Sequence, residues 1–506
     1  MGERPSPSMD YLLGLDIGSS SVKASLVEAA SGSCKASAFF PAAEERIISL
    51  RGGWAEQDVD WWWQNARRST EAVMSQSGAR PADVAAVGVS YQMHGLVCVD
   101  KRLEPLRHAI IWCDSRAVPF GQQAFEALGA DFCLNHLLGS PGNFTAAKLA
   151  WVKANEPDIF RQIRHIMLPG DYIALRLTGQ ARTTVSGLSE GMLWDFLAEA
   201  PAWPLMDYFG FNHSLLPPLT PTFGPQGRLT SHAASLLGLA EGTPVTYRAG
   251  DQPNNALSLG VLDPGQIAAT AGTSGVVYGV TSRPAHDARS RVNVFAHVNH
   301  SPERKHLGIL LCVNGTGILN AWLRRNVASS LSYAGMNELA AQAPAGSEGL
   351  SVLPFGNGAE RLLGNKETGC SVRGLDFNRH SAAHLLRAAQ EGIAFAFKRG
   401  IDIMASMGMP AQTIHAGHAN MFLSPIFRQT LADITGATIH LHDTDGAAGA
   451  AKGAGIGAGV YHTPDEALQT IRRVGTVTPA DNPALQEAYR LWDARLSQEE
   501  ASSPTE

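Results

Sequence analysis

The sequence predicts an α/β protein made of two related domains that hold one nucleotide between them. The main observation is a pair of apolar strands joined by a Gly/Ser/Thr turn, which occurs twice, about 250 residues apart. The copies cover residues 11–27 and 267–280. Such a turn offers backbone N–H groups and hydroxyls with little side-chain bulk, which suits a phosphate oxygen. At 506 residues the chain is also too long for a single hydrophobic core.

Composition excludes several classes of partner. The chain is 44% hydrophobic and 17% charged, and its formal charge of -6 argues against nucleic acid and against an anionic membrane. No apolar run approaches the roughly 18 residues of a membrane helix. Six scattered cysteines without a CxxC pair predict reduced thiols and a cytoplasmic location. The oligomeric state stays open, with a homodimer as one alternative.

The first half of the chain alternates helical and apolar segments. Asp58 or Asp60 caps a helix that we expect to end near Ser77. The proline-rich stretch 201–228 is expected to be irregular surface, and the strand 243–249 ends at Gly250-Asp251. Further apolar runs predict strands at 84–90, 96–100 and 109–116, and helices over 118–128 and after Thr145.

The second half repeats this plan. A helix that begins at Gly446 consists almost wholly of small residues, which let backbones approach closely and suit a crossing point between domains. Strands are expected near 306–313, 412–416 and 438–442, and helices over 382–407 and 424–435. We therefore expect a disordered leader at 1–10, domains at 11–257 and 258–480, and a C-terminal helix and tail at 481–506.

The first turn carries a carboxylate, Asp16. A carboxylate beside phosphates repels them unless a divalent cation lies between, so Asp16 predicts a Mg²⁺ site. An aspartate that fixes its own turn is the alternative, but the second turn in the same chain favours the metal. Lys23 fits either a phosphate contact or a solvated strand lysine. The candidate phosphate-binding residues are Gly18, Ser19, Ser20 and Lys23 in the first copy, and Gly272, Thr273, Ser274 and Gly275 in the second, although the latter four also suit any hairpin.

Asp251 is the strongest catalytic candidate. It follows a strand just before the inferred domain crossing, where a substrate and a nucleotide would meet. Phosphoryl transfer to a hydroxyl needs a carboxylate that accepts the proton and orients the oxygen. A helix N-cap is the structural alternative, and the two roles are compatible.

Several other residues are candidates for ligand contacts. Met93, His94 and Gly95 follow a buried strand, a common place for ligand binding in α/β proteins. The run Trp61–Trp63 fits a sugar-stacking platform or, more often, a core anchor. The remaining candidates are Trp112, Asp114 and Arg116, which fit a polyol pocket or a structural ion pair, Gln252 beside Asp251, and Gly417, His418, Ala419 and Asn420, which fit an adenine contact or an ordinary tight turn.

Longer motifs occur in a fixed order between about Tyr11 and about Tyr461, and through them the chain resembles the FGGY carbohydrate kinases and, within them, the xylulokinases. Besides the two turns and Gly250-Asp251, the motifs are Trp54-Ala55-Glu56-Gln57-Asp58, Gln92-Met93-His94-Gly95, Ala109-Ile110-Ile111-Trp112-Cys113-Asp114-Ser115-Arg116, Phe144-Thr145-Ala146-Ala147-Lys148-Leu149-Ala150-Trp151-Val152 and Leu168-Pro169-Gly170-Asp171-Tyr172.

This resemblance implies two actin-like (ribonuclease H-like) ATPase domains, with ATP and Mg²⁺ in an interdomain active-site cleft. It implies phosphorylation of the terminal hydroxyl of a sugar, D-xylulose. By position, Asp251 becomes the general base and Asp16 the metal-site carboxylate, with Asp251 also at the metal. Met93 and His94 contact the sugar, and the Thr273 turn holds the ATP phosphates.

Three departures from the family pattern bear on specificity. Residues 417–420 replace a triple glycine, Gln252 replaces an asparagine, and residues 358–363 differ from the usual Ser-Gly-Glu-Arg-Thr-Pro. A kinase for another ketose or polyol, such as ribulose, a seven-carbon ketose or glycerol, therefore stays an alternative. A conformational ATPase of the actin and chaperone type is the alternative from another class.

Overall fold

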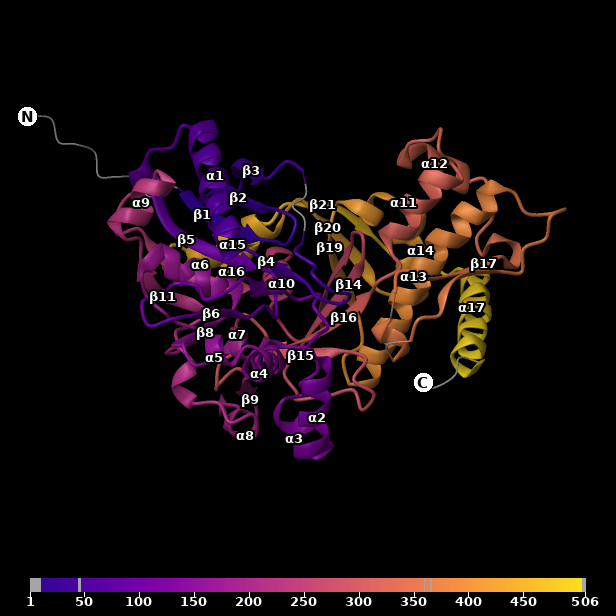
Figure 1. Cartoon of the computed structure of the whole chain (residues 1–506). Helices are drawn as coiled ribbons and strands as arrows, with labels where there is room; N and C mark the ends of the chain where they lie inside the picture. The colour runs from indigo at the N-terminus through magenta and orange to yellow at the C-terminus, as the bar shows by residue number, and fades with distance from the viewer. Residues whose placement is uncertain (1–10, 44–46, 359, 365, 503–506) are drawn as a thin grey trace, which may run out of the picture.

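Two large β-sheets form the framework, one from each half of the chain (Figure 1). The computed structural model describes residues 11–43, 47–358, 360–364 and 366–502. The expected leader at 1–10 lies outside these residues. The first sheet has six strands in the order β11-β12-β5-β1-β2-β3, and the second has seven in the order β15-β16-β14-β13-β19-β20-β21.

The two sheets share one plan. In each, a hairpin with the Gly/Ser/Thr turn supplies a first strand that also pairs in parallel with a later strand: β1 with β5, and β13 with β19. This confirms the predicted pair of related α/β domains. The strands are β1 Tyr11–Ile17, β2 Val22–Glu28, β3 Cys34–Phe40, β5 Val84–Tyr91, β11 Phe223–Arg228, β12 Pro244–Gly250, β13 Gln266–Ala271, β14 Gly275–Thr281, β15 Asn293–Ala296, β16 Leu307–Val313, β19 Thr413–Gly417, β20 Thr438–His442 and β21 Arg473–Val477.

Helix α1, Val59–Ser77, shows how closely local signals define the elements. Asp58 is its N-cap and accepts a hydrogen bond from the backbone N–H of Asp60, as expected. Trp62 and Trp63 are buried in the core between this helix and the first sheet, and Trp62 donates its indole N–H to Gln57. Trp62 and Trp63 are therefore core residues, which was the alternative to a sugar-stacking platform.

Helices occur where they were expected over 118–128, after Thr145, over 382–407 and 424–435, and from Gly446, whereas those at 169–178 and 185–190 were not predicted. The notable helices are α2 Val118–Leu128, α4 Thr145–Asn155, α6 Pro169–Thr178, α7 Val185–Glu190, α10 Asp251–Ser258, α11 Gly317–Asn326, α12 Tyr333–Ala340, α13 Ala382–Ser406, α14 Pro425–Thr435, α15 Gly446–Gly457 and α17 Pro483–Ser502. Within the described ranges, none of the helices combines the length and apolar character needed to cross a membrane.

The expectation of irregular structure over 201–228 is wrong. The segment contains helix α8, Trp203–Tyr208, and edge strand β11. β11 pairs with β12 on one side, and its register shifts between Phe223 and Gly227. Proline and glycine are tolerated there because an edge strand leaves half of its backbone groups unpaired. The loop-like composition therefore concealed a strand.

Helix α15 confirms the expected close approach of small residues. It comes from the C-terminal half of the chain but packs on strands β1 and β5 of the first sheet (Figure 1). A Cβ on Gly14 would lie 1.8 Å from the carbonyl oxygen of Ala447, and one on Gly88 would lie 2.1 Å from that of Ala450. These contacts are possible because neither glycine has a side chain.

Replacing Gly88 should therefore loosen this packing. We expect Gly88→Ala to lower the free energy of unfolding by about 1–3 kcal/mol, because the new methyl group meets rigid backbone. The measurement is the urea unfolding midpoint, with Gly52→Ala as control, since a Cβ on Gly52 meets no atom within 4 Å. Equal stability of the two variants would contradict close backbone packing at Gly88.

Candidate active site

The first carboxylate of the site, Asp16, lies near the end of β1 and beside the start of α15. Ser90 Oγ on β5 donates a hydrogen bond to Asp16 Oδ1 at 2.9 Å. A Cβ on Gly446, the first residue of α15, would lie 2.4 Å from Asp16 Oδ2. Burial is the main cause that raises the pKa of Asp16, and the nearby Asp445 adds to it. The helix N-terminus favours the negative form and partly offsets this cost.

The second carboxylate, Asp251, is the first residue of α10, directly after β12. The N-cap position belongs to Gly250, so the expectation that Asp251 is the cap is shifted by one residue. Burial, followed by the charge of Asp16, raises the pKa of Asp251 to about 7, against hydrogen bonds from Gln252. The sequence therefore brings together two carboxylates that are 235 positions apart and repel each other.

His94 is held in an unusual backbone conformation, with φ 62°. Its Nδ1 lies 2.8 Å from the carbonyl oxygen of Glu190. Because a carbonyl only accepts, Nδ1 carries the hydrogen and Nε2 keeps a free lone pair. Burial lowers the pKa of His94 to about 3, so the ring is neutral at pH 7. His94 can therefore accept a hydrogen bond from a hydroxyl through Nε2.

Met93 and Glu190 lie against the residue that precedes Asp251. A Cβ on Gly250 would lie 2.5 Å from Glu190 Oε2 and 2.6 Å from Met93 Cγ. The Glu190 side chain is buried, and its Oε1 has no hydrogen-bond partner among the described residues. Burial raises the pKa of Glu190 well above its usual range, and the charge of Asp251 acts in the same direction. Sequence reasoning missed Glu190, although a lone carboxylate among small and apolar residues of α7 was a signal.

Asp114 and Arg116 form a buried ion pair. The carboxylate accepts hydrogen bonds from the backbone N–H of Ala55 at 2.6 Å and from Arg116 Nε at 2.8 Å. Arg116 also pairs with Glu56 at 2.6 Å and stacks over Trp54 at 3.8 Å. These contacts are those of a structural ion pair, the alternative to a polyol pocket. Trp112 is half exposed, and a sugar contact for these residues stays a prediction.

The first turn is linked to α15 rather than left free. Lys23, opposite Asp16 in the hairpin, forms an ion pair with Asp445, the N-cap of α15, at 2.7 Å. Gly18 N–H donates to the carbonyl of Ser21, and Gln57 Nε2 donates to that of Ser19. These bonds set the shape of the turn that also contains Ser20.

The second turn borders a cavity of about 520 Å³. The backbone N–H groups of Gly317 and Ile318, at the start of α11, donate to the carbonyls of Gly272 and Thr273. Of the four predicted adenine-side residues, Asn420 lines the cavity, whereas His418 and Ala419 are exposed. The lining residues that sequence reasoning missed come mainly from α11 and α12: Asn320, Ala321, Arg325, Tyr333 and Asn337.

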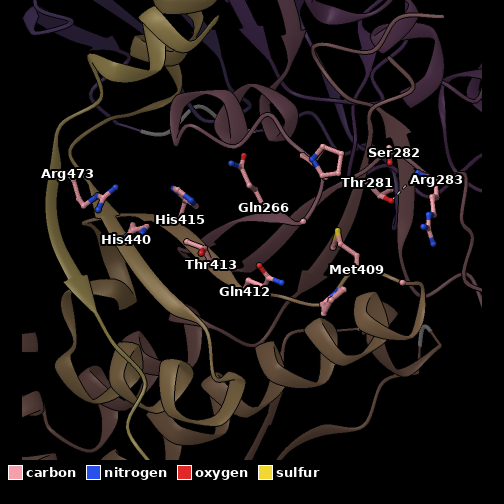
Figure 2. A pocket seen from close by; sticks show the side chains of 15 residues that line it. Gln266, Thr281, Ser282, Arg283, Met409, Gln412, Thr413, His415, His440 and Arg473 are labelled. Atoms are coloured by element: carbon pink, nitrogen blue, oxygen red, sulfur yellow. Dashed lines mark hydrogen bonds between the residues drawn. The ribbon is translucent and has the colours of Figure 1, made fainter. Parts of the chain in front are cut away.

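Another pocket, of about 580 Å³, lies at the opposite end of the same strands (Figure 2). Gln266 begins β13, Thr413 begins β19 and Thr281 ends β14, so the pocket is remote from the Gly272 turn. Its described lining includes none of the predicted site residues. The predicted site residues therefore direct the search for function to the region around the two turns.

Comparisons with known proteins agree with this geometry. The model of the FGGY family of carbohydrate kinases matches residues 11–258 with its N-terminal domain and 267–460 with its C-terminal domain. Xylulose kinase of Escherichia coli is 30% identical over 460 residues, 90% of this chain and 91% of that protein. L-xylulose/3-keto-L-gulonate kinase of the same organism is 30% identical over 488 residues, 93% of each chain. A crystal structure of xylulose kinase from Rhodospirillum rubrum superposes with a TM-score of 0.83 and 26% identity, over 96% of this chain and 98% of that one.

Removing the Asp251 charge should stabilise the metal-free protein in a pH-dependent way. The folded-state pKa of about 7 exceeds the unfolded value of roughly 3.9. Asp251 therefore stays protonated to a higher pH in the folded state than in the unfolded state, and the free energy of unfolding falls as the pH rises from about 4 to about 7. We expect the stability gain of Asp251→Asn to grow by up to about 3 kcal/mol between pH 5 and pH 8. Chemical unfolding in EDTA, with the exposed Asp481→Asn as control, measures this. A gain that is the same at both pH values would mean that Asp251 is ionised in the fold throughout.

Proposed function

The chain belongs to the FGGY family of carbohydrate kinases, and we propose that it phosphorylates D-xylulose on its terminal hydroxyl to give D-xylulose 5-phosphate. Kinases of this family use ATP with Mg²⁺. The observation that carries the proposal is Asp251, a partly buried carboxylate with a pKa of about 7, on which the charge of Asp16 acts and which follows Gly250, the residue that lies against Met93.

Asp251 is the proposed general base. A base is most effective when its pKa lies near the working pH, and phosphoryl transfer needs the acceptor hydroxyl to lose its proton and to point in line with the leaving group. His94 Nε2 is the proposed acceptor for another sugar hydroxyl, since Nδ1 is already bonded to Glu190. Gly95 and Gln252 complete the proposed sugar side.

The residues present fit a magnesium ion. The charge of Asp16 makes ionisation of Asp251 more costly, which is the condition that a divalent cation relieves. In the described part of the chain, His, Cys, Asp and Glu form no group of three or more that could hold a metal. These two carboxylates would therefore hold Mg²⁺ with water and phosphate as its other ligands, and the ion would neutralise charge on the transferred phosphoryl group.

The proposed ATP side joins the two turns to the cavity beside α11 and α12. The Gly272–Gly275 turn offers backbone N–H groups to phosphate oxygens. Asn420 and Asn337 line the cavity and supply amide groups for the adenine edge. In the first turn, Gly18, Ser19 and Ser20 are proposed phosphate contacts, with Lys23 acting through Asp445.

The sugar and the setting are the finer parts of the proposal. Relatives at 30% identity are named for xylulose and for L-xylulose with 3-keto-L-gulonate, so the ketose class is better supported than its stereochemistry.

All six cysteines are free, which supports a reducing, cytoplasmic setting. The two sheets, from 11–250 and 266–477, support two domains that divide near residue 257, although α15 of the second half packs on the first sheet. A homodimer stays a prediction from the sequence.

A coupled ADP-release assay tests the reaction and the sugar. With ATP and Mg²⁺, we expect D-xylulose to stimulate ADP release more strongly than L-xylulose, 3-keto-L-gulonate, ribulose, a seven-carbon ketose or glycerol. Stronger stimulation by another sugar would keep the kinase and change its substrate. Slow ADP release that no sugar stimulates would favour a conformational ATPase.

Asp251→Asn should separate binding from chemistry. The amide keeps the shape of the side chain but cannot accept the hydroxyl proton, so we expect turnover to fall by roughly 100-fold or more. Sugar affinity, measured by calorimetry, should stay within the measurable range. An unchanged turnover number would remove Asp251 from the mechanism.

A further inference from the structure

The loop that carries His94 is held by one segment, Phe144 to Lys148, at the start of α4. The Phe144 ring packs edge-on against the His94 ring, with centroids 4.8 Å apart. Thr145 Oγ1 donates to the carbonyl oxygen of Gly95 at 3.3 Å, and Lys148 Nζ donates to that of His94 at 2.7 Å. The Phe-Thr-x-x-Lys spacing thus places three groups of one helical turn on two consecutive loop residues.

The His94 backbone needs such support. A non-glycine residue with positive φ is strained, and the surroundings must hold it in that conformation. The Lys148 side chain is completely buried, and a buried ammonium is costly unless it is well hydrogen-bonded. Burial lowers the pKa of Lys148 to about 7, although Asp114 and Glu190 oppose the shift. The desolvation cost of Lys148 must be offset by a specific contact, and the contact that it makes is the hydrogen bond to the His94 carbonyl.

We propose that Lys148 is a positioning residue for the sugar site, which holds His94 in its left-handed conformation so that Nδ1 faces Glu190 and Nε2 faces the substrate. This proposal rests on the proposed function of His94 as a sugar contact. Without the Lys148 donor, the His94 carbonyl is buried and unpaired, and the loop gains freedom to move toward ordinary φ values. The imidazole then leaves the Glu190 carbonyl, and neither nitrogen is fixed as the hydrogen carrier.

The test uses the full-length variants Lys148→Met and Lys148→Arg, with Lys153→Met as the matched control. Lys153 lies on the same helix and donates to the carbonyls of Phe209 and Gly210, away from His94. We expect Lys148→Met to raise the KM for the sugar about 10-fold or more, with the KM for ATP within about twofold of wild type. Lys148→Arg, which keeps a cationic donor, should recover part of the loss, and Lys153→Met should leave the sugar KM unchanged.

A spectroscopic readout separates positioning from general stability. Nitrogen-15 NMR of the histidines, assigned with His94→Gln, should show His94 protonated on Nδ1 in wild type and in Lys153→Met. In Lys148→Met it should show a mixture of tautomers. A folded Lys148→Met with wild-type sugar KM and an unchanged His94 spectrum would overturn the proposal.

Should Lys148→Met fail to fold, Lys148→Gln takes its place, because its neutral side chain is one bond shorter than that of lysine; an unchanged His94 spectrum and sugar KM in that variant would overturn the proposal. Should wild type show no sugar-stimulated ADP release, the proposed function fails on that result alone. The tautomer spectrum of Lys148→Met then still decides whether Lys148 positions His94.

Discussion

Direct backbone contact between α15 and the first sheet is the constraint on which the site depends. The helix can lie against β1 and β5 because Gly14 and Gly88 leave room for its carbonyl groups. The same contact brings the first residue of α15 against the Asp16 carboxylate. On its other side α15 packs against α10, where Gly449 meets Asn254 and Ser258, and Asn254 donates a hydrogen bond to the Gly446 carbonyl. Since α10 begins at Asp251, one helix of small residues fixes the relative position of both carboxylates.

The electrostatics of the site follow from this placement. Burial raises the pKa of both carboxylates, and the charge of Asp16 adds to the shift of Asp251, where the proposed mechanism needs an available base. The Lys23–Asp445 ion pair joins residues 422 positions apart and fastens β2 to the cap of α15. It keeps the helix N-terminus at Asp16, where the charge of Asp445 raises the pKa of the carboxylate and that of Lys23 lowers it. Under the proposed function, a bound cation would neutralise the acidic pair.

Local elements were predictable from the sequence, and long-range partners were not. Caps, turns and apolar periods are local signals, which is why α1, α2 and both hairpins agree with expectation. β11 was missed because its proline and glycines are typical of loops, and only its edge position makes them tolerable. The sequence identified Asp16 and Asp251 as candidate functional carboxylates. No local pattern predicted that Glu190 and Lys148 both hydrogen-bond to His94. Such contacts depend on how α4 and α7 pack, and spacing carries no information about this.

His94 also connects the proposed sugar side to the second sheet. Its ring packs against both Phe144 and Phe295, which also contact each other, and Phe295 belongs to β15 of the second sheet. Helix α7, whose last carbonyl fixes the His94 tautomer, exchanges two hydrogen bonds with Ala296 of β15: Ser186 Oγ donates to its carbonyl, and its N–H donates to Ser189 Oγ. A change in the angle between the two sheets must therefore carry α7 along or break both bonds. Either outcome alters the contacts that hold the imidazole, so the angle between the two sheets and the geometry of the proposed sugar site are coupled in this fold.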